Sequence, residues 1–159
     1  MLQRHGDATS SALMQSEEDV VNASSDRLLR RTLWGNAVFS IASGAVLALF
    51  AGPFARIAAQ APVEMAGLDL AIVFELLGLG VIAFGALCAW IASRQILPIA
   101  WIRVIFAADL AWVAGSVLVL ALPATWTTAG VAGIVVVALI VADLAILEYL
   151  GLRRLGTAT

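Results

Sequence analysis

One acidic residue, Asp109, lies well inside an apolar run that extends from Ile99 to Leu122. A helix of this length spans about 36 Å, which exceeds the hydrocarbon core of a bilayer, about 30 Å thick. The Asp109 carboxyl would then sit near the middle of the membrane, where an isolated charge is costly. We therefore expect Asp109 to face the interior of a helix bundle, to accept a hydrogen bond, or to stay protonated.

The residues that can surround Asp109 come from its own helix and from the first apolar segment. Trp112 and Ser116 follow Asp109 at i+3 and i+7, which places all three on one helical face. Asn36 lies in the first apolar segment, somewhat nearer the predicted inner surface. Asn36 can make a polar contact with the helix that carries Asp109, and the sequence does not determine the geometry of that contact.

Three further acids, Glu75, Asp143 and Glu148, lie in other apolar segments and allow two interpretations. In the functional one, they form with Asp109 a ladder of titratable groups, as a proton-coupled carrier would use. In the structural one, Asp109 and Asp143 fasten helices together, and Glu75 and Glu148 are interfacial charges. We favour the structural interpretation, because no spacing places the four acids on a common surface.

Catalytic, metal and cofactor sites are not expected. The lone Cys88 lies inside an apolar run, so a disulfide within the chain and a Cys-x-x-Cys pair are excluded. The lone His5 lies in the polar N-terminal segment, which leaves no histidine in the apolar segments for a nucleophilic pair or a haem. The chain has no lysine and no basic, aromatic-rich patch, so nucleic acid is not an expected partner. We expect no enzyme, no cofactor and no bound metal.

Composition predicts a membrane protein. The chain of 159 residues is 62% hydrophobic and 13% charged, and its mean hydropathy is +1.01. We predict an all-α fold, a bundle of four transmembrane helices in contact with the lipid bilayer. Residues 1–26 are predicted to be a flexible polar tail, and 27–155 the transmembrane domain. The predicted spans are about 33–51, 70–93, 99–122 and 129–150.

Small residues recur on one face of each of the first two predicted helices, a pattern that lets helix backbones approach closely. The candidate helix-packing residues are Ser40, Gly44, Ala48, Gly78, Gly85 and Ala89. Gly52 and Pro53 are predicted to end the first helix, with residues 53–68 forming a loop.

Arginine counting predicts the orientation. If four spans are present, Arg56 falls on one side of the membrane and most other arginines fall on the opposite side. The arginines of that opposite side are Arg27, Arg30, Arg31, Arg94, Arg103, Arg153 and Arg154. Both termini are therefore expected to be cytoplasmic, in a multi-pass protein of a bacterial inner membrane.

Three short stretches carry a resemblance to a protein family. They are Asn36-Ala-Val-Phe-Ser40 with Ser43-Gly44, Ala108-Asp-Leu-Ala-Trp-Val113 with Gly115-Ser116, and Gly151-Leu-Arg-Arg154. This pattern resembles one in small uncharacterised bacterial four-helix inner-membrane proteins, over about residues 27–155. The resemblance implies a fold, but no activity and no catalytic residue. It also implies an uncharged amide where this chain has Glu148.

Two functions follow as expectations. The first is a structural or accessory subunit that packs against other helices, as a homo-oligomer or within a larger membrane complex. The alternative is a small carrier or proton-conducting protein that uses Asp109 with Glu75 and Asp143.

Overall fold

A computed structural model describes the backbone of residues 3–65, 67–121 and 126–156, and the side chains of residues 24, 26–65, 67–121 and 126–154. The regular secondary structure of this part of the chain is helical apart from one pair of two-residue strands and one isolated bridge between Ala59 and Trp126. In chain order the elements are α1 (Gln3–Leu49), α2 (Ala51–Ala58), β1 (Glu64–Met65), β2 (Leu68–Asp69), α3 (Leu70–Ala92), α4 (Ile99–Ala121) and α5 (Thr128–Gly156).

Four helices are long and apolar enough to cross a membrane, which is the pattern of a multi-pass membrane protein. Their candidate spans are Asp26–Leu49, Leu70–Ala92, Ile99–Ala121 and Thr128–Arg154. The prediction of four long apolar helices is thus confirmed. The predicted last residue of the third span, Leu122, lies outside the described residues.

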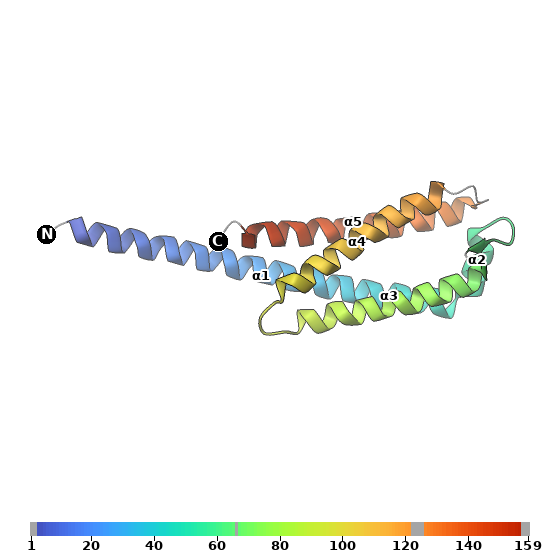
Figure 1. Cartoon of the computed structure of the whole chain (residues 1–159), viewed down its shortest axis with the longest axis horizontal. Coiled ribbons are helices and arrows are strands. Elements are labelled where there is room, and N and C mark those ends of the chain that lie inside the picture. The colour runs from blue at the N-terminus through green and yellow to red at the C-terminus, as the bar shows by residue number, and fades with distance from the viewer. Residues whose placement is uncertain (1–2, 66, 122–125, 157–159) are drawn as a thin grey trace.

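The long helices pack most extensively through α1 and α3, and α5 contacts α4 and α1 to a similar extent. α1 packs along α3, α4 packs along α5, and α5 also contacts α1, whereas α3 and α4 make few contacts. Figure 1 shows α2 at one end of the molecule and the α3–α4 turn, with the end of α5, at the other. The N-terminal part of α1 projects beyond the other helices (Figure 1).

The start of α1 differs from the sequence prediction. This helix has 47 residues and begins at Gln3, so the segment predicted as a flexible tail is helical from that residue onward. The physical reason is helix extension, because adding residues to the apolar part of α1 needs no new nucleation and residues 3–26 contain no proline to interrupt it. The flexibility of residues 1–26 stays a prediction.

The segment after α1 also differs from its prediction as a loop. A single residue, Phe50, separates α1 from α2, and Pro53 lies inside the first turn of α2. Proline is tolerated there because the first N–H groups of a helix have no partner within the helix. Gly52 and Pro53 therefore begin a new helix, and β1 and β2 follow as an antiparallel pair.

Glycines determine how closely α1 approaches α3. A Cβ atom at Gly44 would lie 2.7 Å from the Gly78 carbonyl oxygen, and one at Gly78 would lie 2.6 Å from the Gly44 carbonyl oxygen. A Cβ at Gly85 would lie 3.0 Å from the Ala37 carbonyl oxygen. Ala48 also contacts Gly78. The two backbones therefore touch directly, an arrangement that larger side chains would prevent.

Arg30 joins α1 to the end of α3. Its Nη1 donates to the Ala92 carbonyl oxygen at 2.9 Å and to the Arg94 carbonyl oxygen, and its Nη2 donates to the Gln95 carbonyl oxygen at 2.6 Å. Asp26 completes the set by accepting from Arg30 Nε at 2.8 Å. The guanidinium thus donates hydrogen bonds to carbonyl groups at and just beyond the C-terminus of α3. These carbonyl groups have no N–H donor within that helix.

Replacing Arg30 with leucine should loosen the α3–α4 turn. Loss of these hydrogen bonds is expected to cost about 1–2 kcal/mol of local stability, which corresponds to about 5- to 30-fold faster amide hydrogen exchange there. Exchange over residues 92–97, followed by mass spectrometry, measures it. Arg31→Leu is the matched control, since Arg31 is exposed. Equal acceleration in both variants would contradict the role given to Arg30.

Candidate functional site

Three helices bring polar side chains together in the apolar interior. Asn36 of α1 donates from Nδ2 to Asp109 Oδ2 of α4 at 2.7 Å and to Glu148 Oε1 of α5 at 3.4 Å. Ser40, one helical turn after Asn36, donates from Oγ to Asn36 Oδ1 at 3.1 Å. We call these four residues, Asn36, Ser40, Asp109 and Glu148, the Asn36 cluster.

The Asn36 cluster is closed to the surroundings of the protein. Asn36 is 1% exposed, Ser40 5%, Asp109 3% and Glu148 0%. An apolar layer lies next to the cluster and includes Leu29, Leu33, Ala37, Cys88, Ile91, Ile102 and Ile105. Buried polar groups of this kind must find their hydrogen bonds within the protein, because neither lipid nor water reaches them.

Two carboxyl groups share one amide donor in this cluster. Neither Asp109 nor Glu148 forms an ion pair with another described residue. Their bonds to Asn36 hold Asp109 Oδ2 and Glu148 Oε1 no more than about 6 Å apart, a distance at which two charges in an apolar interior repel strongly. The buried Cys88 of α3 is near enough to interact electrostatically with both acids.

Two buried polar atoms beside this arrangement have no hydrogen-bond partner among the described residues. They are Glu148 Oε2 and Trp112 Nε1. An unsatisfied buried polar atom is costly in an apolar interior, so each calls for a physical account.

The structure unites some of the predicted site residues and separates others. Asp109 and Asn36 are in direct contact. Trp112 is half-buried, and Ser116 donates to the Trp112 carbonyl oxygen within α4 at 2.9 Å. Glu75 and Asp143 are exposed on α3 and α5. The structure therefore brings Asp109 and Glu148 together and places Glu75 and Asp143 on outward faces.

Glu148 is the site residue that the sequence interpretation misplaces. The sequence predicts an interfacial charge near the arginines at the end of α5, yet the Glu148 side chain is fully buried. The rotation of α5 explains the difference, because it turns Glu148 toward Asn36 and leaves Asp143 outside. The resemblance predicts an amide at position 148, and an amide within an apolar helix needs a hydrogen-bond partner. That expectation is a sequence signal that position 148 faces a neighbouring helix.

The candidate helix-packing residues divide among three settings. Gly44, Ala48, Gly78 and Gly85 lie where α1 touches α3. Ala89 packs, partly buried, against the apolar layer beside the Asn36 cluster. Ser40 belongs to the cluster itself.

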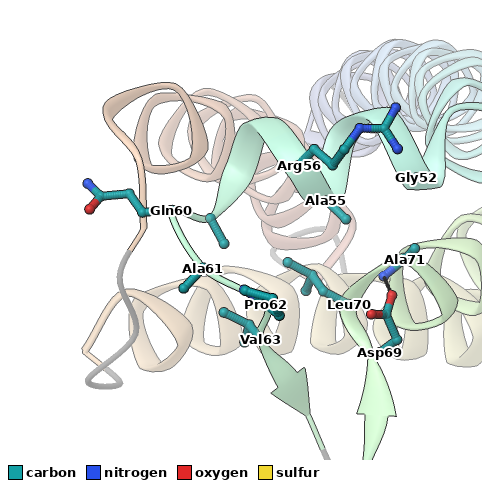
Figure 2. Close-up of a pocket in the computed structure, with 11 residues that line it drawn as sticks. Gly52, Ala55, Arg56, Gln60, Ala61, Pro62, Val63, Asp69, Leu70 and Ala71 are labelled. Atoms are coloured by element: carbon teal, nitrogen blue, oxygen red, sulfur yellow. Dashed lines mark hydrogen bonds between the residues drawn. The ribbon is translucent and has the colours of Figure 1, made fainter.

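A separate hollow of about 420 Å³ lies at the α2 end of the molecule. Its lining comes from α2, the segment before β1, and the start of α3, as Figure 2 shows. The Asp69 carboxylate caps α3 by accepting from the Ala71 N–H at 2.8 Å, and Gln60 points away from the hollow (Figure 2). These polar groups do not converge on a common point, so the hollow lacks the arrangement of a specific polar binding site.

Among the described residues, no group of three or more His, Cys, Asp or Glu side chains is arranged to hold a metal ion. The chemistry that the Asn36 cluster can perform is therefore that of carboxyl and amide groups, which donate, accept and exchange protons.

Comparisons with known proteins assign no family to the chain, so the proposed function rests on the geometry described above. No family model matches the chain, and no curated protein or solved structure shows significant similarity to it.

Proposed function

We propose that the chain is an accessory subunit of a membrane complex in a bacterial inner membrane, where it packs against a transmembrane helix of another protein. In this proposal the four apolar helices form a membrane-spanning bundle with both termini in the cytoplasm. The distribution of arginines supports this orientation, because most of them belong to the end of the molecule opposite α2.

The observation that carries the proposal is the position of Asp143. This residue is exposed on α5, inside the candidate span Thr128–Arg154. About 16 Å of helix separates Asp143 from Arg154, too far for a short aspartate side chain to reach the interface. Its neighbours on the same face, Leu139, Ile140 and Ile146, are exposed apolar residues. A carboxyl group that faces lipid at this depth costs about 2.5–3.5 kcal/mol on insertion scales, so we infer that another helix covers it.

The chemistry of Asp143 indicates what that helix carries. A carboxyl group needs a hydrogen-bond donor, which on a transmembrane helix is supplied by arginine, asparagine, glutamine, serine or threonine. This chain offers no such donor on the outward faces of its described spans at the same depth. The exposed donors of its described spans lie nearer the span ends than Asp143 does. Thr128 is the first residue of α5, and the others lie near the start of the candidate spans in α1 and α4 or near the end of those in α3 and α5: Arg27, Arg31, Trp34, Trp90, Trp101, Arg103, Tyr149, Arg153 and Arg154. A partner of different sequence therefore fits better than a second copy.

Replacing Asp143 with leucine should weaken the complex about 3- to 20-fold, which corresponds to the 0.6–1.7 kcal/mol measured for hydrogen bonds between membrane helices. A photo-crosslinking residue at Ile146, on the same face, reports the contact in intact membranes. The crosslinked peptide should be a transmembrane segment with a donor residue at the depth of Asp143.

The matched control is Glu64→Leu, which removes an exposed carboxylate outside the candidate spans and should leave the crosslink unchanged. Crosslinks to a second copy of the chain would contradict the choice of partner. Crosslinks to lipid alone, together with a more stable Asp143→Leu variant, would overturn the accessory function.

The carrier interpretation receives less support from the geometry. It requires Glu75, Asp109 and Asp143 along one path, but Asp109 is buried whereas the other two face outward on different helices. A carrier that uses these three acids stays a prediction of the sequence.

A further inference from the structure

We propose that Asp109 and Glu148 together hold a single proton, which makes the Asn36 cluster an intramembrane proton-binding site. The ligand is a hydrogen ion taken from water, and the bond that forms is an O–H bond on the Glu148 carboxyl. This inference is independent of the accessory function, because it concerns the interior of the chain and not the outward face of α5.

The shared donor is the first step of the argument. Asn36 Nδ2 carries two hydrogens, and both acids accept from it. The 2.7 Å bond to Asp109 has the length of a charge-assisted hydrogen bond, whereas the 3.4 Å contact with Glu148 is long. The amide therefore stabilises a negative charge on Asp109 better than one on Glu148.

The second step is the environment of Glu148. Its side chain is 0% exposed, and its Oε2 has no hydrogen-bond partner among the described residues. An ionised carboxylate in this position would have an unsolvated charge, in addition to repulsion from Asp109. A neutral carboxylic acid avoids both costs, since it carries no charge and needs fewer hydrogen bonds.

The third step is the absence of compensating charge nearby. Within the described chain, α1 presents the neutral Asn36 and Ser40 to the acids, and α3 presents the Cys88 thiol. α4 and α5 contribute the two carboxyl groups themselves, and neither makes an ion pair with a described residue. A second negative charge in the cluster would therefore have no cation to balance it, and the proton supplies the missing positive charge.

The consequence is a coupling between proton binding and helix packing. Release of the proton to water would leave two carboxylates bound to one amide, and their repulsion would push α5 away from α1 and α4. The cluster then holds three helices together only while the proton is bound.

Infrared difference spectroscopy of the full chain in lipid nanodiscs tests the proposal. At neutral pH the chain with Asp143→Leu, which removes the outward-facing acid of α5, should show the C=O stretch of a protonated carboxyl group, equivalent to one group per chain, which shifts to lower frequency in D₂O. Glu148→Gln in the same chain should abolish this band completely. The matched control, Glu64→Gln, alters an exposed acid outside the candidate spans and should leave the band unchanged.

A second measurement on the chain with Asp143→Leu needs no substitution in the Asn36 cluster. Raising the pH should remove the band together with the release of one proton per chain. The absence of a protonated carboxyl band in this chain would overturn the proposal, as would a band that survives Glu148→Gln. A band that sodium chloride abolishes at constant pH would also contradict it, because a metal cation and not a proton would then balance the charge.

Discussion

Replacing Gly78 with leucine should separate α1 from α3 and abolish the native packing of the chain. Even a single Cβ at this position would lie 2.6 Å from the Gly44 carbonyl oxygen and 2.7 Å from the Ala48 backbone nitrogen. Backbone atoms cannot move aside as a flexible side chain can, so the helices must shift apart. Overpacking of this kind costs about 1–3 kcal/mol in well-packed cores, and a leucine side chain extends well beyond its Cβ atom.

Thermal unfolding in a mild detergent, followed by size-exclusion chromatography, measures this loss. The matched control is Gly80→Leu on the same helix, where a Cβ atom would meet nothing within 4 Å. We expect Gly80→Leu to behave like the wild type and Gly78→Leu to aggregate or to unfold at a much lower temperature. Equal stability of the two variants would show that α1 and α3 do not meet through these glycines.

Replacing Asn36 with leucine should destabilise the chain strongly, because both acids of the Asn36 cluster accept from this one amide. Each buried group left without a partner costs about 1–3 kcal/mol, although hydrogen bonds between membrane helices average nearer 0.6 kcal/mol. We therefore expect a loss of about 1–4 kcal/mol, measured by denaturant unfolding. Ser43→Ala is the control, since Ser43 Oγ donates to the Phe39 carbonyl oxygen within α1.

A rescue variant distinguishes this mechanism from poor packing. Replacing both partners of a buried polar contact with apolar groups can be nearly neutral, whereas replacing one is costly. The triple variant Asn36→Leu, Asp109→Leu, Glu148→Leu should therefore be more stable than Asn36→Leu alone. If the triple variant is no more stable than Asn36→Leu, the lost contacts of Asn36 do not account for the stability loss of that variant.

The apolar helices could be predicted from the sequence because their main signal is length. A run such as Ile99–Leu122 must be a helix if it crosses lipid, since every backbone polar group needs a partner within the segment. The structure begins α4 at Ile99 and α3 at Leu70, at the start of the corresponding predicted spans. Hydropathy alone thus locates such spans closely.

The direction in which each acid points could not be predicted in the same way. α5 is apolar on most of its circumference, so its sequence has no polar face that sets its rotation. Glu148 and Asp143 therefore look alike in the sequence, each as a single acid within an apolar helix. The structure buries Glu148 and exposes Asp143. Glu148 is buried because it contacts Asn36, a residue more than a hundred positions away from both acids in the sequence.

The α2 segment shows a different limit. Gly52 and Pro53 are signals both for the end of one helix and for the first turn of the next. The choice between these depends on contacts with distant residues, such as the hydrogen bond from the Thr127 N–H to the Ala58 carbonyl oxygen at 2.9 Å. No local pattern around α2 encodes that partner.

Cysteine accessibility in intact cells tests the central claim most directly, namely that four helices cross the membrane with both termini on the cytoplasmic side. The wild-type chain is a suitable background because its one cysteine, Cys88, is buried. Single cysteines would replace Ser24, Gln60 and Gln95, and a further one would be added after Thr159.

A membrane-impermeant maleimide added from outside should label only Gln60→Cys, and the other three positions should become reactive after the cells are lysed. Labelling of position 24 and of the added C-terminal cysteine from opposite sides of the membrane would contradict the four-span arrangement.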